Sequence, residues 1–359
     1  MNTFFLDRLN SEPHALAFAG QSTPWPVTLA DQSANPVLDE ALHTHADAAQ
    51  ALLYPVSADL LATTGRPVDL FGFEPNPARL GAAAAASASV PGIALAQLGA
   101  LLDAASLGYN PAVAKPVAVL GHSQGVLAVH MVQAIVEAGS IEAASAQIDE
   151  ILAIATLIGV AGTRQARQLG LAARHGEATP MLSVKDITRA QVDALIKRVS
   201  GARGPIAVAV TNSATHYVLS GYPEDLAAFG VEVAKEHKHQ AKLREEKVRG
   251  GRVFEPVLEY LDVTLPFHSP LMAEAVSQAV SWAESCGINA DHARELAAEV
   301  LLNHVDWAAR VRALMKSTDP SALWVLDFGP GNHCRQAVLH RCPRHWRRRG
   351  GSLHRGRSW

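Results

Sequence analysis

One nine-residue stretch, Val117–Gly125, constrains the fold of this chain more than any other. It reads Val-Ala-Val-Leu-Gly-His-Ser-Gln-Gly, and a largely apolar segment over 126–136 follows it at once. An apolar run that leads into Gly-x-Ser-x-Gly and then into an apolar helix is typical of a buried strand that turns sharply into a helix. The pattern predicts that Ser123 stands at the apex of this turn and acts as a nucleophile.

The residues around Ser123 suit that role. Gly121 and Gly125 lack a Cβ, so neighbouring backbone can approach a turn whose conformation is strained. The following helix directs its N-terminal amides and the positive end of its dipole towards the place where an oxyanion would form. The alternative is a tight turn whose serine has no chemical role.

Size and composition are those of a soluble enzyme. The 359 residues suffice for one large domain or a domain with an insertion, and 48% are hydrophobic against 18% charged. The three cysteines, Cys286, Cys334 and Cys342, are too scattered for a disulfide framework, which favours a reducing compartment. The N-terminus lacks the apolar core of a signal peptide, and no uninterrupted apolar run is long enough for a membrane span. We therefore expect a cytoplasmic protein with no membrane partner.

Apolar periodicity predicts an α/β order for most of the chain. Buried strands are expected within 15–25, 117–120 and 322–331, and helices over 36–64, 90–103, 126–136, 148–166, 273–285 and 290–302. The helix over 148–166 is expected to be interrupted near Gly159 and Gly162.

The segment 178–262 has a different pattern. Its strands and helices are expected in the order β-α-β-β-α, with a further strand before His268, which is the split-βαβ pattern of a ferredoxin-like subdomain. The strands are expected over 181–184, 206–211 and 217–220, and the helices over 188–199 and 223–236. The charged stretch over 237–252 is expected to be a solvated loop. An irregular continuation of the main domain is the alternative.

His268 is the best candidate for the base that Ser123 needs. A serine hydroxyl is a poor nucleophile until a base accepts its proton, so one histidine has to reach it in space. Pro266 and Pro270 flank His268 and fix its loop, whereas the side chain of His122 is expected to point elsewhere from the sharp turn. A structural histidine is the alternative, but its combination with the Ser123 turn favours a catalytic role.

Several separate motifs now stand in one order along the chain. They are Gly20-Gln21, Gly-His-Ser-Gln-Gly over 121–125, Met-Leu-Ser-Val over 181–184, Val-Leu-Ser-Gly over 218–221, Lys-Val-Arg-Gly-Gly over 247–251, Pro-Phe-His-Ser-Pro over 266–270 and Leu-Asp-Phe-Gly-Pro-Gly over 326–331. In order and rough spacing they resemble the malonyl/acetyl-CoA:acyl-carrier-protein transacylase family. Within that family, the chain looks most like the N-terminal acyltransferase (acetyltransferase) domain of type I fatty acid synthases.

The resemblance implies a fold and a reaction. The fold is an α/β-hydrolase-like core over 1–177 and 263–332 with an inserted ferredoxin-like subdomain over 178–262. The reaction is ping-pong transfer of an acyl group from acetyl-CoA or malonyl-CoA to the phosphopantetheine thiol of an acyl carrier protein, through an ester on Ser123 with His268 as base. No cofactor is bound permanently, and other domains of a fatty acid synthase are further expected partners.

The resemblance also implies roles for further residues. The backbone amides of Gln21 and Gln124 form the oxyanion hole, and a backbone carbonyl at about Asn332 orients His268, because this family has no triad acid. Asn212 corresponds to a supporting asparagine between the subdomains and, with His122, belongs to the expected substrate-binding residues. For Asn212, ordinary satisfaction of a buried polar group is the alternative.

Ile158 carries the expectation for the acyl group. Malonyl-selective members of the family have an arginine on a helix after the nucleophile, whose guanidinium pairs with the malonyl carboxylate. The resemblance places Ile158 at that position, and an unpaired buried carboxylate costs several kcal/mol. Acetyl is therefore favoured over malonyl, unless Arg164, about two turns further on, supplies the cation instead.

The last 27 residues do not match the rest of the chain. Residues 333–359 contain eight arginines and no acidic residue, so the first 332 residues carry 23 − 34 = −11 charges. We hypothesise a frameshifted or fragmentary gene product for this stretch. A basic nucleic-acid-binding tail and a plain solvated tail are the alternatives, and the expectation is no nucleic-acid partner. Cys334 and Cys342 with the nearby histidines lack a zinc-ligand spacing, so no metal is expected.

Two other functions remain open at this point. One is a serine esterase or thioesterase, which needs an Asp or Glu between Ser123 and a late histidine. Asp149 and Asp186 are candidates, but neither has the expected setting at a strand end. The other is an inactive truncated fragment of a fatty acid synthase.

Overall fold

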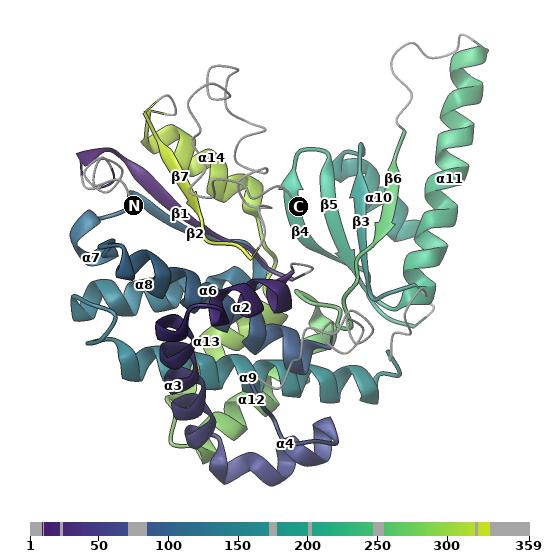
Figure 1. Cartoon of the computed structure of the whole chain (residues 1–359). Helices are drawn as coiled ribbons and strands as arrows, with labels where there is room; N and C mark the ends of the chain where they lie inside the picture. Colours follow the sequence, from purple (N-terminus) through teal and green to yellow (C-terminus); the bar gives the residue numbers. More distant parts are fainter. Residues whose placement is uncertain are drawn as a thin grey trace.

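The computed structural model describes residues 9, 11–21, 24–70, 85–171, 178–199, 203–246, 255–319 and 322–330. The described residues form two units that lie side by side, a larger one with a parallel sheet and many helices and a smaller one with an antiparallel sheet (Figure 1). Asn332 and the basic stretch over 333–359 lie outside the described residues, and so does the motif over 247–251.

The parallel sheet of the larger unit places the Ser123 turn. Its strands are β1 (His14–Phe18), β2 (Ala118–Gly121) and β7 (Trp324–Asp327), in the order β2-β1-β7. Every residue of β1 is buried, as expected for a central strand of a parallel sheet that is covered on both faces. Phe18 pairs in register with Gly121, so β1 and β2 end together at the edge of the sheet where the turn begins.

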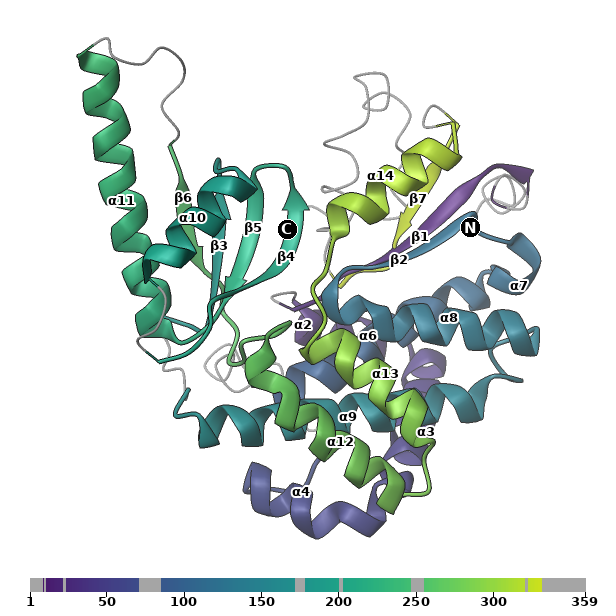
Figure 2. The ribbon, with the colours of Figure 1, turned by 180° about the vertical axis from the view of Figure 1, so that it is seen from behind.

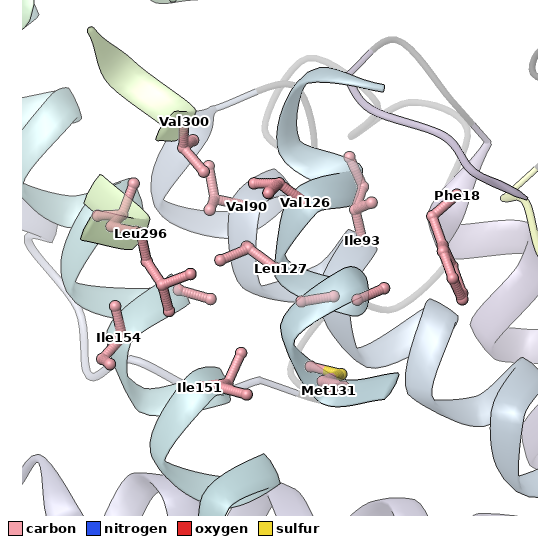
Figure 3. Packing of buried hydrophobic residues seen from close by; sticks show 14 of the residues in the cluster. Phe18, Val90, Ile93, Val126, Leu127, Met131, Ile151, Ile154, Leu296 and Val300 are labelled. Carbon is pink, nitrogen blue, oxygen red and sulfur yellow. The ribbon is translucent and has the colours of Figure 1, made fainter. Parts of the chain in front are cut away.

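Helices surround this sheet. They are α2 (Trp25–Ser33), α3 (Pro36–Leu52), α4 (Ser57–Thr64), α6 (Ala86–Ser106), α7 (Pro111–Ala114), α8 (Val126–Ala138), α9 (Ser145–Gln168), α12 (Ala273–Ser285), α13 (Ala290–Leu301) and α14 (Trp307–Ser317), with short 3₁₀ turns η1 (Tyr54–Val56), η3 (Ser123–Gly125) and η4 (Pro270–Met272). Figure 3 shows how side chains from β1, α6, α8, α9 and α13 interlock, among them Phe18, Ile93 and Leu127. This shared core fixes α8, and with it the turn that precedes α8.

Two of these helices, α6 and α9, are long and apolar enough to cross a membrane by length and composition alone. In each, 72% of the most apolar window is buried, and the two helices pack on each other. They are therefore core helices. A Cβ on Gly159 of α9 would lie 2.4 Å from the carbonyl oxygen of Ala86, so this glycine lets α6 and α9 approach closely.

The smaller unit is inserted between α9 and α12. It runs β3 (Met181–Lys185), α10 (Arg189–Val199), β4 (Ala207–Ser213), β5 (His216–Ser220), α11 (Pro223–Glu245) and β6 (Val257–Tyr260), and its sheet order is β4-β5-β3-β6. All three strand pairs are antiparallel. Its helices cover one face of the sheet around a separate small core that includes Leu219, Phe229 and Leu182. The other face turns towards the larger unit (Figure 2).

The structure corrects three details of the sequence prediction. The stretch over 237–252 is not a loop throughout, because α11 continues to Glu245 and stands out beyond the sheet (Figure 1). The helix over 148–166 is not interrupted: α9 is continuous past Gly159 and Gly162. A helix that the sequence analysis did not recognise, α14, lies between β4 and the parallel sheet (Figure 2).

Backbone contacts join the two units beside α14. The amide of Thr211 in β4 donates to the carbonyl of Val305 at 2.8 Å, and the amide of Val305 donates to the carbonyl of Ala209 at 3.0 Å. Met181 and Val218 from the smaller sheet take part in the main hydrophobic core. The residues that lead into α14 are thus fixed against the smaller unit.

Candidate active site

Ser123 and His268 meet, although 145 positions separate them in the sequence. The Oγ of Ser123 lies 2.6 Å from Nε2 of His268. Ser123 is at the first position of η3, directly before α8, and His268 lies in the loop before η4. Both residues have a positive φ, 53° and 56°, a conformation that is rare for residues other than glycine and that marks strained functional turns.

Three glycines make room for the turn. A Cβ on Gly20 would lie 2.6 Å from the carbonyl oxygen of His122, and one on Gly125 would lie 2.4 Å from that of Phe18. A Cβ on Gly121 would lie 2.5 Å from the amide nitrogen of Val126. Contacts this short are not tolerated, so the turn requires glycine at all three positions.

A backbone carbonyl fixes the orientation of His268. Nδ1 of His268 lies 2.8 Å from the carbonyl oxygen of Asn303, in the short link between α13 and α14. Since a carbonyl oxygen only accepts, Nδ1 carries the ring proton and Nε2 is free to accept the proton of Ser123. The resemblance implied a carbonyl at about Asn332; that expectation is wrong, because the carbonyl that meets Nδ1 belongs to Asn303.

Burial lowers the pKa of His268 to about 3, since the protonated ring would lose its hydration. The bond to the Asn303 carbonyl raises this pKa in part, and the positive charge of Arg310, with those of His122 and His304 when protonated, lowers it. The base is therefore unprotonated at neutral pH, as general-base catalysis requires.

We expect acylation of Ser123 to proceed at the same rate, within about twofold, at pH 5 and pH 7.5. A histidine with the ordinary pKa would be about 3% unprotonated at pH 5, and acylation would slow about 30-fold. Rapid-quench measurement of the initial acylation rate at both pH values checks this. A loss near 30-fold at pH 5, with the protein still folded by circular dichroism, would contradict the lowered pKa.

Gln21 and Gln124, the two expected oxyanion residues, lie together. The Nε2 of Gln21 donates to Oε1 of Gln124, and Nε2 of Gln124 donates to the carbonyls of Ser89 and Val90 at 3.2 and 2.7 Å. A Cβ on Gly20 would lie 3.4 Å from the amide nitrogen of Gln124, so the Gly20-Gln21 loop passes directly over the turn. The two glutamines are thereby held together beside the Ser123 turn.

His122 and Asn212 also meet, across the two units. Nε2 of His122 lies 2.9 Å from Oδ1 of Asn212 in β4, and the ring of His122 stands edge to face against Trp307 at 5.2 Å. The ring of His122 thus lies in the contact with the smaller unit. The pair links the nucleophile turn to the inserted unit.

Ile158 is fully buried on α9, within the main hydrophobic core. Arg164, the cation that the sequence left as an alternative, is exposed: its Nη1 donates to Gln278 of α12 at 3.1 Å, and its guanidinium lies over Trp282. Arg164 is therefore engaged with α12.

In the part of the chain that the structure describes, Ser123 and His268 have no carboxylate partner that would complete a triad. The acid of a triad would bond Nδ1 of His268, and this nitrogen bonds the Asn303 carbonyl instead. Asp149, one of the acids considered from sequence, is paired with His45 at 2.6 Å. Asp186 lies in the turn after β3, beside α11. Among the described residues, no group of three His, Cys, Asp or Glu side chains is arranged to hold a metal ion.

Comparisons with known proteins match a family model, curated proteins and solved structures. Residues 180–260, which make up most of the smaller unit, match the family model described as the fatty acid synthase central AT domain. Among curated proteins, the chain is 24% identical over 248 residues to the fatty acid synthase beta subunit hexB of Dothistroma septosporum. The match covers 60% of this chain and 13% of that protein, so the chain spans about an eighth of its relative.

Solved structures match over almost the whole chain. The malonyl CoA-acyl carrier protein transacylase of Coxiella burnetii superposes with a TM-score of 0.59 at 16% identity, covering 91% of this chain and 90% of that one. A malonyl-transacylase solved in complex with a type II polyketide synthase acyl carrier protein superposes with a TM-score of 0.57 at 17% identity, covering 91% of this chain and 92% of that one. The chain therefore has the fold of the malonyl-CoA:acyl-carrier-protein transacylases, and its residues 180–260 are similar to the central AT domain of fatty acid synthases.

Proposed function

We propose that the protein is an acyltransferase that moves an acyl group from coenzyme A to the thiol of an acyl carrier protein through an ester on Ser123. The observation that carries the proposal is the 2.6 Å contact between Ser123 and an Nε2 that is kept free of its proton by the Asn303 carbonyl. A serine paired with such a base is an activated nucleophile.

The reaction has two halves that use the same groups. Ser123 Oγ attacks the thioester carbonyl carbon while Nε2 of His268 takes the hydroxyl proton. Collapse of the tetrahedral intermediate then expels the CoA thiolate, to which His268 gives this proton. The carrier thiol then gives its proton to His268 and attacks the ester, and Ser123 leaves and is reprotonated. The backbone amides of Gln21 and Gln124 are the proposed donors to the oxyanion in both halves.

The proposal includes a finer description of the fold. We assign the larger unit to an α/β-hydrolase-like core, supported by parallel strands and the strand-turn-helix around Ser123. We assign the smaller unit to the ferredoxin-like class. Its β-α-β-β-α-β order and the antiparallel sheet order β4-β5-β3-β6 support this.

Acetyl is the proposed acyl group. Ile158 offers no charge to a malonyl carboxylate, and the guanidinium of Arg164 is engaged with Gln278 and Trp282 of α12. Without a cationic partner, entry of a carboxylate into an apolar site costs several kcal/mol. His122 and Asn212 are proposed to border the substrate where the two units meet.

The proposed partners follow from the reaction. The acyl donor is an acyl-CoA, and the acceptor is the phosphopantetheine arm of a carrier protein. A malonyl-transacylase of this fold that was solved in complex with its acyl carrier protein supports such a partner. The proposed chemistry needs no permanently bound cofactor, since the carrier protein brings the phosphopantetheine. The match to a fatty acid synthase subunit supports other synthase domains as partners and a cytoplasmic location.

Intact-mass analysis tests the function. After incubation with acetyl-CoA, the wild-type protein is expected to gain one acetyl group, and Ser123→Ala is expected to gain none because the nucleophilic oxygen is gone. Addition of a phosphopantetheinylated carrier protein is expected to remove the acetyl group and to produce acetylated carrier.

The same experiment separates the alternatives. Loss of the acetyl group to water at a rate that the carrier protein does not change would show an esterase or thioesterase. No adduct on a folded wild-type protein would show an inactive fragment. Either result contradicts the proposed transfer.

A further inference from the structure

Arg310 reaches the nucleophile turn from a different part of the chain. Its Nη1 donates to the backbone carbonyl of Gly121 at 2.8 Å, across 189 positions of sequence. Arg310 lies on α14, the helix between β4 and the parallel sheet (Figure 2), and Gly121 is the last residue of β2, two residues before Ser123. The contact joins a charged donor to the peptide group at which the turn begins.

The backbone around that peptide group is strained and crowded. Ser123 has a positive φ, and backbone crowds Gly121, where an added Cβ would lie 2.5 Å from the amide nitrogen of Val126. A strained turn persists only where surrounding contacts over-determine it. A charge-assisted hydrogen bond to the first carbonyl of the turn is such a contact, because it fixes the plane of the peptide that leads into His122 and Ser123.

The rest of α14 and its lead-in support the same place. Trp307, at the start of α14, stands against the ring of His122 at 5.2 Å. Asn303, in the link before α14, holds Nδ1 of His268. We propose that Arg310 is a positioning residue that holds the Ser123 turn in its reactive conformation by fixing the Gly121 carbonyl. The inference rests on the proposed nucleophilic role of Ser123.

Arg310 has two opposite effects on the rate at which Ser123 attacks. Its hydrogen bond holds the turn and speeds attack by Ser123, whereas its positive charge, with those of His122 and His304 when protonated, opposes protonation of His268. The side chain of Arg310 is exposed, so solvent and salt screen its charge, and Arg310 is the smallest contributor to the lowered pKa of His268. The hydrogen bond therefore dominates at neutral pH.

The test compares Arg310→Met, Arg310→Lys and the control Arg312→Met, an exposed arginine two residues along the same helix. The probe is an alkyl fluorophosphonate, which labels an activated serine without need of acetyl-CoA, and the labelling rate is read by intact mass. We expect Arg310→Met to label about tenfold more slowly at pH 7.5, which corresponds to about 1.4 kcal/mol. Arg310→Lys should regain most of the rate because an ammonium group can donate to the same carbonyl, and Arg312→Met should match the wild type.

A second readout separates positioning of the turn from a change in the base. Because Arg310 is the smallest contributor to the lowered pKa of His268, the acid limb of the labelling rate is expected to stay at the wild-type pH in Arg310→Met and Arg310→Lys. Labelling of Arg310→Met at the wild-type rate, or a fall matched by the fraction of unfolded protein, would overturn the inference. Wild-type protein that reacts with the fluorophosphonate but not with acetyl-CoA would refute the proposed donor, while the labelling rates still decide the role of Arg310.

Discussion

Replacement of His268 by glutamine is expected to slow acylation of Ser123 by acetyl-CoA about 10³-fold, within the range that a general base contributes. The histidine is 2% exposed and bonded on both ring nitrogens, to Ser123 and to the Asn303 carbonyl. Glutamine is close to it in size, and its amide can still donate to a carbonyl, so the cavity stays filled. It cannot take the serine proton at neutral pH.

The measurement is the pre-steady-state acetylation rate by quench and intact mass. His43→Gln is the matched control, because His43 lies exposed on α3, far along the chain from His268, and its ion pair with Asp39, at 3.7 Å, is a surface pair. We expect this control to acetylate at the wild-type rate. If folded His268→Gln retained more than about a tenth of the wild-type rate, another group would be the base and the dyad would be wrong.

The sequence was sufficient to find the dyad because both residues sit in short-range patterns. The run into Gly-x-Ser-x-Gly predicts a turn from local sterics, and the glycine contacts at Gly20, Gly121 and Gly125 are the physical form of that pattern. Likewise His268 stands in a loop fixed by Pro266 and Pro270. The strands and helices that carry them were also predictable, since their buried residues follow regular periods.

The group that orients His268 was not found, because a backbone carbonyl leaves no mark in a sequence. The carbonyl of Asn303 meets Nδ1 only through the packing of the link between α13 and α14. One signal was present: Asp306 caps α14 by accepting from the amide of Ala309, and Trp307, Val311 and Leu314 lie at helical spacing. A prediction of α14 would have indicated that the link between α13 and α14 lies near the site.

Two smaller errors have equally physical causes. Charged residues after position 236 suggest a solvated loop, yet α11 continues to Glu245, since polar side chains at helical spacing form ion pairs such as Lys242 with Glu246. Gly159 and Gly162 suggest a break, yet they stand where α9 meets other side chains and backbone closely. Local ion pairs decide the first case, and tertiary contacts decide the second.

Introduction of a cation at position 158 is expected to reverse the choice of acyl group. We predict that Ile158→Arg raises the ratio of malonyl-CoA to acetyl-CoA acylation rates about 100-fold, which corresponds to about 2.7 kcal/mol. The reason is that a guanidinium can form two hydrogen bonds to the malonyl carboxylate, whereas isoleucine forms none. The acetyl rate itself should fall, since the new charge has no partner when the acyl group is neutral.

Ile158→Met is the matched control, because methionine is unbranched like arginine but carries no charge, and it should leave the ratio of rates unchanged. Both variants are to be measured by the rate of acyl-enzyme formation with each donor, alongside thermal unfolding with and without malonyl-CoA. Stabilisation of Ile158→Arg by malonyl-CoA but not by acetyl-CoA is expected. Ile158 is fully buried in the main core, so the contrary result would also be informative. If Ile158→Arg unfolds or keeps the wild-type ratio, position 158 only fills the core and the acetyl preference has another origin.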